Sequence, residues 1–290
     1  MILVVGATGQ LGGLIAQTLL VQAKPVRTLV RGSTFGALVT AGAEPVIGDL
    51  KDPASLMSAC RGVDAVVTTA NATARGGEDT VESVDLVGNR NLVDAAAAQG
   101  VRRFVFVSSL GASPDHPMPL LRAKGQTEQR LRDSGMAWTV LQPNMFLDKL
   151  PMAVVGGPAL AGQPVALVGE GRRRHSLVAM RDVAAYAVAA LERRQAQGQT
   201  LVIGGPQPVS WRAIIAEFAQ QLGREIPVRT VPSGQPVPDM PEFVADLLSA
   251  LETYDSPIDS SALAAAYGVT PTSLTDFVRD FIATSRQRVG

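Results

Sequence analysis

The first thirteen residues of the chain, MILVVGATGQLGG, constrain the fold more than any other stretch. The run before Gly6 is apolar throughout, which predicts a strand that is buried on both faces. Gly6, Gly9 and Gly12 then mark a tight turn into a helix that we expect at 10–22. Glycines at this spacing permit the turn, let backbone amides approach a pyrophosphate, and allow the helix to pack closely on the strand. An ordinary strand-to-helix turn is the alternative, and the pattern of the following residues favours the dinucleotide-binding turn.

Strand and helix patterns alternate six times through the first half of the chain. After the first strand, further strands are expected at 25–30, 44–47, 63–69, 103–109 and 137–141. A long helix is expected at 78–99 and another at 120–134. Such alternation requires parallel strands joined by right-handed crossovers. The predicted fold class is therefore α/β, a doubly wound parallel Rossmann sheet with a smaller C-terminal α+β portion.

The pattern changes from Pro151 onwards, where Pro and Gly become frequent and the apolar runs become shorter. Helices are expected near 181–194, 210–223, 241–251 and 273–286. We therefore expect a division into a dinucleotide-binding domain at 1–150 and a smaller substrate-binding portion at 151–290 that packs on it.

Composition excludes several classes of function. The chain carries 26 basic and 26 acidic residues, so no nucleic-acid-binding surface is indicated. It is 46% apolar, yet it has no run of about 18 apolar residues that would cross a membrane. Because a strand is expected from the first residues, we expect no signal peptide with its basic segment there. A single cysteine and two histidines argue against a disulfide framework and against a bound metal. We expect a cytoplasmic protein.

In doubly wound sheets ligands bind outside the carboxyl ends of the strands, so the residues just past each strand form the candidate site. Those after the first strand would hold the pyrophosphate, because the helix begins there and its first amides are unpaired. The expected contacts are Gly6, Thr8, Gly9, Gln10 and Leu11 after the first strand, Ala70, Asn71 and Ala72 after the fourth, Ser108 and Ser109 after the fifth, and Pro143 and Asn144 after the sixth.

The residue after the second strand indicates which cofactor is preferred. A protein that prefers NAD would carry Asp or Glu there for the ribose hydroxyls, whereas Arg31 matches a 2′-phosphate. NADP(H) is therefore favoured over NAD(H), with a solvated surface arginine as the alternative. Asp49, after the third strand, is expected to accept a hydrogen bond from the adenine amino group. Its alternative is a turn or a helix N-cap before Pro53.

Five short motifs occur at these strand ends: GATGQLG at 6–12, LVR at 29–31, GDL at 48–50, FVFVSS at 104–109 and QPNMF at 142–146. Together they resemble the NmrA-like branch of the atypical short-chain dehydrogenases. That branch includes quinone reductases, isoflavone-reductase-like enzymes, triphenylmethane-dye reductases and regulators that bind the dinucleotide without turnover. The resemblance is strong to about residue 150 and adds Leu50 and Phe146 to the expected cofactor contacts.

The catalytic residues depart from the usual pattern. Short-chain dehydrogenases protonate the substrate oxygen with a tyrosine whose pKa is lowered by a lysine four residues later. Lys124 lies in the expected region, but Leu120 stands four positions before it. Ser109 could hydrogen-bond a carbonyl, and Lys124 could hold the nicotinamide ribose and stabilise an oxyanion. The alternative for Lys124 is a solvated helix face with ion pairs four residues apart.

Three functions remain open from the sequence. The first is an NADPH-dependent reductase of a flat apolar acceptor such as a quinone, whose reduced oxygens water can protonate. The second is a redox sensor that binds the dinucleotide without turnover and signals to a partner protein. The third is an assembly or scaffold protein built on the same fold. The fold alone does not choose among them.

Overall fold

The structure is a computed structural model that describes residues 1–32, 36–72, 77–237 and 240–287. The chain folds into two compact units. The first unit comprises Met1–Pro143, Met180–Ile203 and Ala265–Val269, and the second comprises Asn144–Ala179, Gly204–Ala264 and Thr270–Gly290. The chain thus leaves the first unit after Pro143 and returns to it twice, which differs from the single division expected at residue 150.

The first unit is built on a seven-stranded sheet in the order β3-β2-β1-β4-β5-β6-β8, and every neighbouring pair is parallel. This order confirms the predicted doubly wound α/β fold and places β1 beside the point where the strand order reverses. The strands are β1 (Ile2–Val5), β2 (Val26–Val30), β3 (Glu44–Ile47), β4 (Ala65–Thr68), β5 (Arg103–Val107), β6 (Ala137–Pro143) and β8 (Gln199–Ile203).

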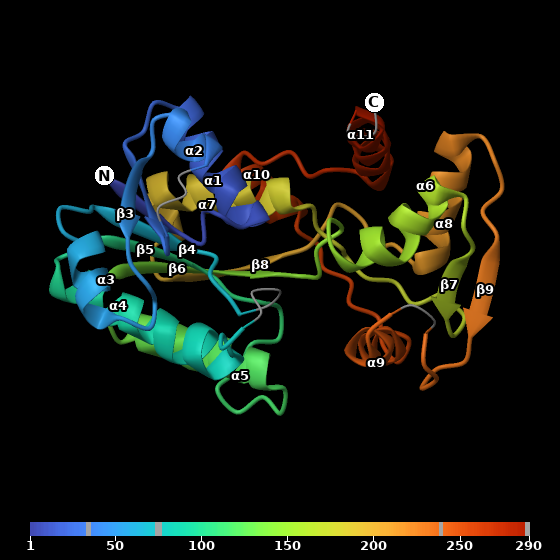
Figure 1. The fold of residues 1–290 in the computed structure, drawn as a ribbon, viewed down its shortest axis with the longest axis horizontal. Coiled ribbons are helices and arrows are strands. Elements are labelled where there is room, and N and C mark those ends of the chain that lie inside the picture. Colours follow the sequence, from blue (N-terminus) through green and yellow to red (C-terminus); the bar gives the residue numbers. More distant parts are fainter. Residues whose placement is uncertain (33–35, 73–76, 238–239, 288–290) are drawn as a thin grey trace. The chain divides into compact units, whose positions relative to one another are not determined.

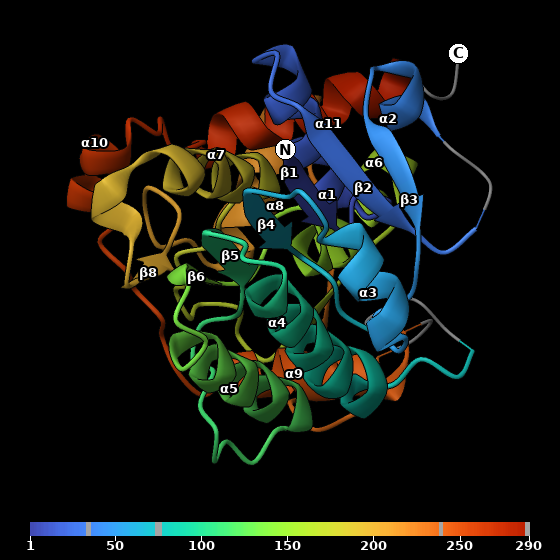
Figure 2. The same cartoon turned by 90° about the vertical axis from the view of Figure 1, so that its left-hand side faces the viewer.

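Helices cover both faces of this sheet. In Figures 1 and 2, α1 and α7 lie on one face, and α3, α4 and α5 lie on the other. A buried apolar cluster that includes Leu3, Val66 and Phe104 lies between the sheet and helices α3, α4 and α5. The helical segments of this unit are α1 (Gln10–Val21), α2 (Ala37–Thr40), α3 (Pro53–Ala59), η1 (Val81–Gly88), α4 (Asn89–Ala98), α5 (Pro119–Arg132), α7 (Met180–Glu192) and η3 (Arg194–Ala196).

Two features of this unit differ from the sequence prediction. Strand β8 pairs with β6 and extends the sheet, although its sequence lies beyond the stretch where strands and helices alternate regularly. The expected helix at 78–99 is π-helical over η1 before it continues as α4. The Asn89 side-chain amide donates to the carbonyls of Val84 and Asp85, so a side chain binds carbonyls inside the helical segment.

The start of α3 offers a simple stability test. Asp52 is the N-cap, and its Oδ1 accepts from the Ala54 amide at 3.0 Å, while Pro53 occupies the first helical position. We expect Asp52→Ala to lower the free energy of unfolding by about 1 kcal/mol, measured by urea denaturation. The control is Ser58→Ala, which removes only an exposed hydroxyl bonded to Ala54 O within the same helix. An unchanged urea midpoint for Asp52→Ala would contradict this role of the cap.

The second unit has its own apolar core around Ile214, Phe218 and Val278, with Phe281 edge-on to Phe218 at a centroid distance of 6.0 Å. Its two strands, β7 (Val165–Val168) and β9 (Val228–Val231), form a parallel pair. Its helices are η2 (Met152–Gly156), α6 (Gly157–Ala161), α8 (Trp211–Leu222), α9 (Glu242–Leu251) and α11 (Leu274–Gln287). The residues of helix α10 (Ser261–Tyr267) are divided between the two units. In the described part of the chain, no helix has both the length and the apolarity needed to cross a membrane.

Candidate functional site

The glycine turn lies at the carboxyl end of β1, beside the end of β4. Gly6 has φ +88°, and a Cβ there would come within 2.6 Å of Thr69 Oγ1. A Cβ on Gly12 would lie 2.2 Å from the Gly6 carbonyl oxygen, so α1 packs directly against the turn. Neither position can hold a side chain without moving its neighbours, which is the structural reason for two of the three glycines.

The third glycine keeps the other side of the turn open. Gly9 is the N-cap of α1 in extended conformation, and among the described residues no side chain caps the helix. A Cβ on Gly9 would meet only Gly6 O within 4 Å, at 3.2 Å, among the described atoms. Thr8, Gly9 and Gln10 are exposed, while Leu11 is buried in the core. The positive end of a twelve-residue helix is therefore accessible, and a pyrophosphate fits there.

Buried polar side chains that were not predicted from the sequence form hydrogen bonds with the backbone that follows β4. Asp85 is 1% exposed, and its Oδ2 accepts from the Ala72 amide at 2.8 Å. Asn89 is also 1% exposed and donates to Ala70 O at 3.2 Å. Ala70 is buried, and Asn71 donates to Thr69 O. These bonds fix the backbone of the three predicted residues after β4.

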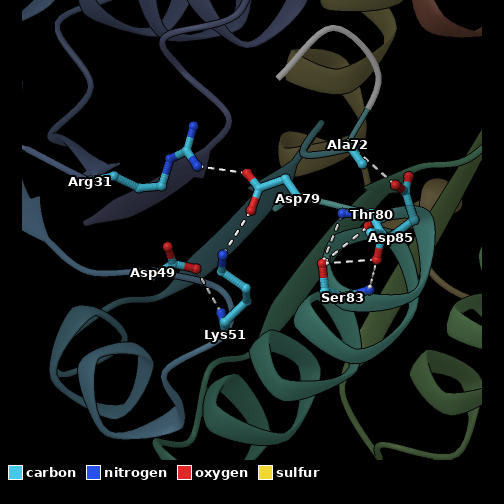
Figure 3. A network of polar contacts seen from close by, with 8 residues as sticks. All are labelled: Arg31, Asp49, Lys51, Ala72, Asp79, Thr80, Ser83 and Asp85. Carbon is cyan, nitrogen blue, oxygen red and sulfur yellow. Dashed lines mark hydrogen bonds and ion pairs between the residues drawn. The ribbon is translucent and has the colours of Figure 1, made fainter. Parts of the chain in front are cut away.

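A network of charges lies at the ends of β2 and β3 (Figure 3). Arg31 Nη1 donates to Asp79 Oδ2 at 2.6 Å, and Lys51 Nζ donates to Asp79 Oδ1 at 2.8 Å. The hydrogen bond to Asp79 raises the pKa of Lys51. Arg31 is thus half exposed and ion-paired, so its contact with a 2′-phosphate stays a prediction beside the surface-arginine alternative. Neither Lys51 nor Asp79 was predicted from the sequence, because the two are brought to Arg31 only by folding.

The two predicted residues after β3, Asp49 and Leu50, have structural roles. Asp49 Oδ1 accepts from the Lys51 amide at 2.8 Å, which is the expected turn alternative, whereas the N-cap of α3 is Asp52. Leu50 is 3% exposed and belongs to the apolar core, where Gly88 leaves room for its Cβ. The side chain of Leu50 therefore points into the protein, and only its backbone remains for a ligand.

Lys124 and Glu128 form a buried polar cluster with Ser108 under the end of β5. Lys124 Nζ donates to Val107 O at 3.1 Å and lies 5.3 Å from the centre of the Phe106 ring. The carboxylate of Glu128 accepts from Ser108 Oγ, from Gln142 Nε2 and from Arg132 Nη2. The solvated-face alternative is therefore wrong for Lys124. The spacing of Lys124 and Glu128 by four residues is the signal that could have revealed a shared buried face.

The environment of Lys124 changes its proton affinity. Desolvation by burial lowers its pKa, while the nearby carboxylates of Asp85 and Glu128 oppose that effect. Ser109, one residue after Ser108, is only partly buried. Of the predicted catalytic pair, Lys124 is thus held inside the protein, whereas Ser109 lies closer to the surface.

No tyrosine in the described part of the first unit stands in for the missing acid. Tyr186 is 1% exposed, and desolvation raises its pKa to about 12, which makes it a weaker acid. Its ring packs 6.0 Å from that of Tyr267, whose pKa burial also raises. Tyr254 belongs to the second unit, where its ring meets His175 edge-on.

The predicted residues at the end of β6 are divided between the units. Pro143 is the last residue of β6, and its carbonyl accepts from the Leu110 amide. Asn144 and Phe146 belong to the second unit, where Phe146 forms a parallel bridge with Val178. The Asn144 amide donates to Ser256 O at 3.2 Å and to Ser256 Oγ at 3.1 Å. The structure therefore gives Asn144 a structural role, and its contact with a nicotinamide stays a prediction.

His175 completes that structural cluster of the second unit. It is 2% exposed, with Nδ1 at 2.8 Å from Ser256 Oγ and Nε2 at 3.1 Å from Leu251 O. Since a carbonyl can only accept, Nε2 carries the proton and Nδ1 accepts from the serine. Burial lowers the pKa of His175, which favours the neutral ring.

Comparison with known proteins agrees with this geometry. A family model described as NAD(P)H-binding matches residues 6–194. The chain is 33% identical over 259 residues to an NAD(P)H azoreductase of Xenophilus azovorans, covering 87% of this chain and 86% of that protein. It is 32% identical over 235 residues to photosystem II assembly factor Ycf39 of Cyanophora paradoxa, covering 80% of this chain and 71% of the factor.

Solved structures show the same fold. An NADPH-dependent quinone oxidoreductase of Escherichia coli, solved with NADPH, superposes with a TM-score of 0.78 at 24% identity. The match covers 97% of this chain and 99% of that one. The family match and the similarity to the azoreductase confirm the expected resemblance to the NmrA-like atypical short-chain dehydrogenases.

Proposed function

Because this chain belongs to the NAD(P)H-binding family, we propose that it is a cytoplasmic reductase that uses NADPH to reduce a flat apolar acceptor such as a quinone. The main support is the glycine turn at β1, where an uncapped helix N-terminus is open to solvent. An anion placed there receives backbone N–H bonds and the positive end of the helix dipole.

Each part of the nucleotide has a proposed partner in the first unit. The amides of Thr8, Gln10 and Leu11 would hold the pyrophosphate beside Gly9, whose own amide donates to Gly6 O at 2.9 Å. Arg31 would hold the 2′-phosphate through its exposed guanidinium. The carboxylate of Asp49 would accept from the adenine amino group. The backbone after β4, which is hydrogen-bonded to Asp85 and Asn89, would lie beside the ribose. When bound, NADPH supplies a hydride to the acceptor.

The side chains after β5 suggest the class of acceptor. Ser109 would hydrogen-bond the acceptor carbonyl, and the charge of Lys124 would stabilise an oxyanion. No phenol stands four residues before Lys124, and the tyrosines of the first unit are buried and weakened as acids. A quinone needs no strong acid, because its reduced oxygens are comparatively acidic and take protons from water. The second unit would supply the substrate-binding side chains.

The test measures binding first and turnover second. Nicotinamide fluorescence gives the affinity of the purified protein for NADPH and for NADH, and loss of nicotinamide absorbance follows oxidation by a panel of quinones and azo compounds. We expect Arg31→Ala to weaken NADPH binding by about 10- to 100-fold, since a hydrogen bond to a charged group contributes about 1.5–3 kcal/mol. NADH binding should change less than about twofold, because NADH lacks the 2′-phosphate.

The other outcomes separate the rival functions. Tight nucleotide binding without turnover on any acceptor would favour a regulatory or assembly role, which the similarity to the Ycf39 assembly factor makes a specific alternative. If neither nucleotide binds, the reductase and sensor hypotheses both fail. If Arg31→Ala affects NADPH and NADH equally, the preference for NADPH is wrong although the reductase proposal stands.

A further inference from the structure

The charge network at the ends of β2 and β3 contains more than one cation (Figure 3). Arg31 follows β2, Lys51 follows β3, and Asp79 precedes η1, so three separate segments of the first unit meet there. One carboxylate oxygen of Asp79 binds Arg31 at 2.6 Å and the other binds Lys51 at 2.8 Å. A single carboxylate therefore bridges two cations.

Exposure differs sharply among the three side chains. Asp79 is 5% exposed, whereas Arg31 is 51% exposed and Lys51 is 39% exposed. The carboxylate is thus covered while the two cations keep much of their surface in water. An anion that arrives from solvent meets the arginine and lysine first, with the charge of Asp79 close behind them.

We propose that Arg31 and Lys51 together form a phosphomonoester site and that Asp79 is its internal counter-anion, which reduces the preference for NADPH over NADH. This inference rests on the proposed function, since the phosphomonoester is the 2′-phosphate of the cofactor. The phosphate carries up to three terminal oxygens and can contact an arginine and a lysine at once. It meets a net charge of +1 from the three side chains, because Asp79 cancels one of the two positive charges.

The sign of the effect of Asp79 follows from two opposing contributions. Its carboxylate, though covered, holds two cations that are 51% and 39% exposed, and an ion pair with a cation that keeps so much of its surface in water contributes little to such ordering. Its negative charge also repels a phosphate bound to the same cations, and that repulsion acts over a few ångströms with partial shielding from water. The repulsion is the larger contribution, so removing the charge strengthens phosphate binding.

The experiment compares Asp79→Asn and Lys51→Gln with the wild-type chain by isothermal titration with NADPH and with NADH. We expect Asp79→Asn to tighten NADPH binding about tenfold and Lys51→Gln to weaken it about tenfold, with NADH changing less than about twofold in both. Asp94→Asn is the matched control, because it removes the carboxylate from an exposed ion pair with Arg130 elsewhere in the first unit. Should Asp79→Asn fold poorly, Asp79→Ser carries the same expectation.

Several results would overturn the inference. Weaker NADPH binding by Asp79→Asn would show that the carboxylate positions the cations rather than competing with phosphate. An unchanged ratio of NADPH to NADH affinity in Lys51→Gln would remove Lys51 from the site. If the wild type binds NADH and NADPH but neither variant changes the ratio, only this inference fails. If the wild type binds neither nucleotide, the proposed function fails with it.

Discussion

Replacing Gly9 by Asp is expected to abolish the binding of NADPH and NADH together while leaving the protein folded. Gly9 is the N-cap of α1 and has an extended conformation that any residue can adopt. Asp is a favoured N-cap residue and can accept from the free amides of the first turn, which stabilises the helix. The same carboxylate occupies the position proposed for the pyrophosphate and repels it.

The expected size of this effect is a loss of at least about 100-fold in affinity for either nucleotide, because charge-assisted hydrogen bonds to the pyrophosphate are replaced by repulsion. Fluorescence titration measures the affinity, and thermal unfolding followed by circular dichroism measures the stability. Gly9→Ala is the control for the added Cβ, which would lie 3.2 Å from Gly6 O, and it adds no charge. Normal binding by Gly9→Asp would rule out this turn as the pyrophosphate site.

Replacing Lys124 by Met is expected to lower quinone turnover by roughly 10²–10³-fold, which is more than it lowers NADPH affinity. The proposed role of Lys124 is to stabilise an oxyanion, and loss of one such electrostatic contact has about that effect on kcat. Met fills a similar volume with an apolar chain, so the space between Val107 and Phe106 stays filled. Single-turnover absorbance measurements separate the hydride-transfer rate from nucleotide binding.

The same variant should change how stability depends on pH. Burial lowers the pKa of Lys124 below its ordinary value of 10.5, so in the interval between these values the unfolded chain holds a proton that the folded chain has lost. Stability from this residue therefore rises with pH through that interval and is lost as the pH falls. In Lys124→Met this contribution disappears, which urea unfolding at about pH 7 and about pH 10 would detect.

The control for Lys124 is Lys24→Met. Lys24 is 40% exposed and pairs with Glu192, so its removal tests the loss of a lysine that has no proposed role in the reaction. If Lys124→Met reduces quinones at the wild-type rate, Lys124 has only a structural role. A fall in NADPH affinity equal to the fall in turnover would instead place it in cofactor binding.

Much of the first unit could be predicted because its signals are local. The apolar run of β1, the three glycines after it and the regular spacing of strands indicate a parallel sheet whatever the rest of the chain does. Helices α8, α9 and α11 of the second unit were also placed closely, because their apolar residues recur at helical spacing, whereas η2, α6 and α10 were not predicted. Strand β8 was missed, since only its pairing with β6 distinguishes it from a short apolar segment.

The burial of polar residues could not be predicted in the same way. Lys124 and Glu128 lie in a stretch rich in charges, which is typical of an exposed helix, yet both are nearly buried under β5. Whether a lysine faces water or a carbonyl such as that of Val107 depends on what packs against its helix. Glu128 in turn depends on Ser108 and Gln142, which lie on other elements.

The sequence by itself determined the α/β fold, the glycine turn and Arg31 after β2, because each depends on residues that are adjacent along the chain. Only the tertiary structure showed that Met180–Ile203 and Ala265–Val269 belong to the first unit. It alone also showed that Asp79 binds both Arg31 and Lys51. Asp79 lies 48 positions from Arg31 and 28 from Lys51 in sequence. Contacts over such separations depend on the order of the parallel strands in the sheet, so no local sequence pattern predicts them.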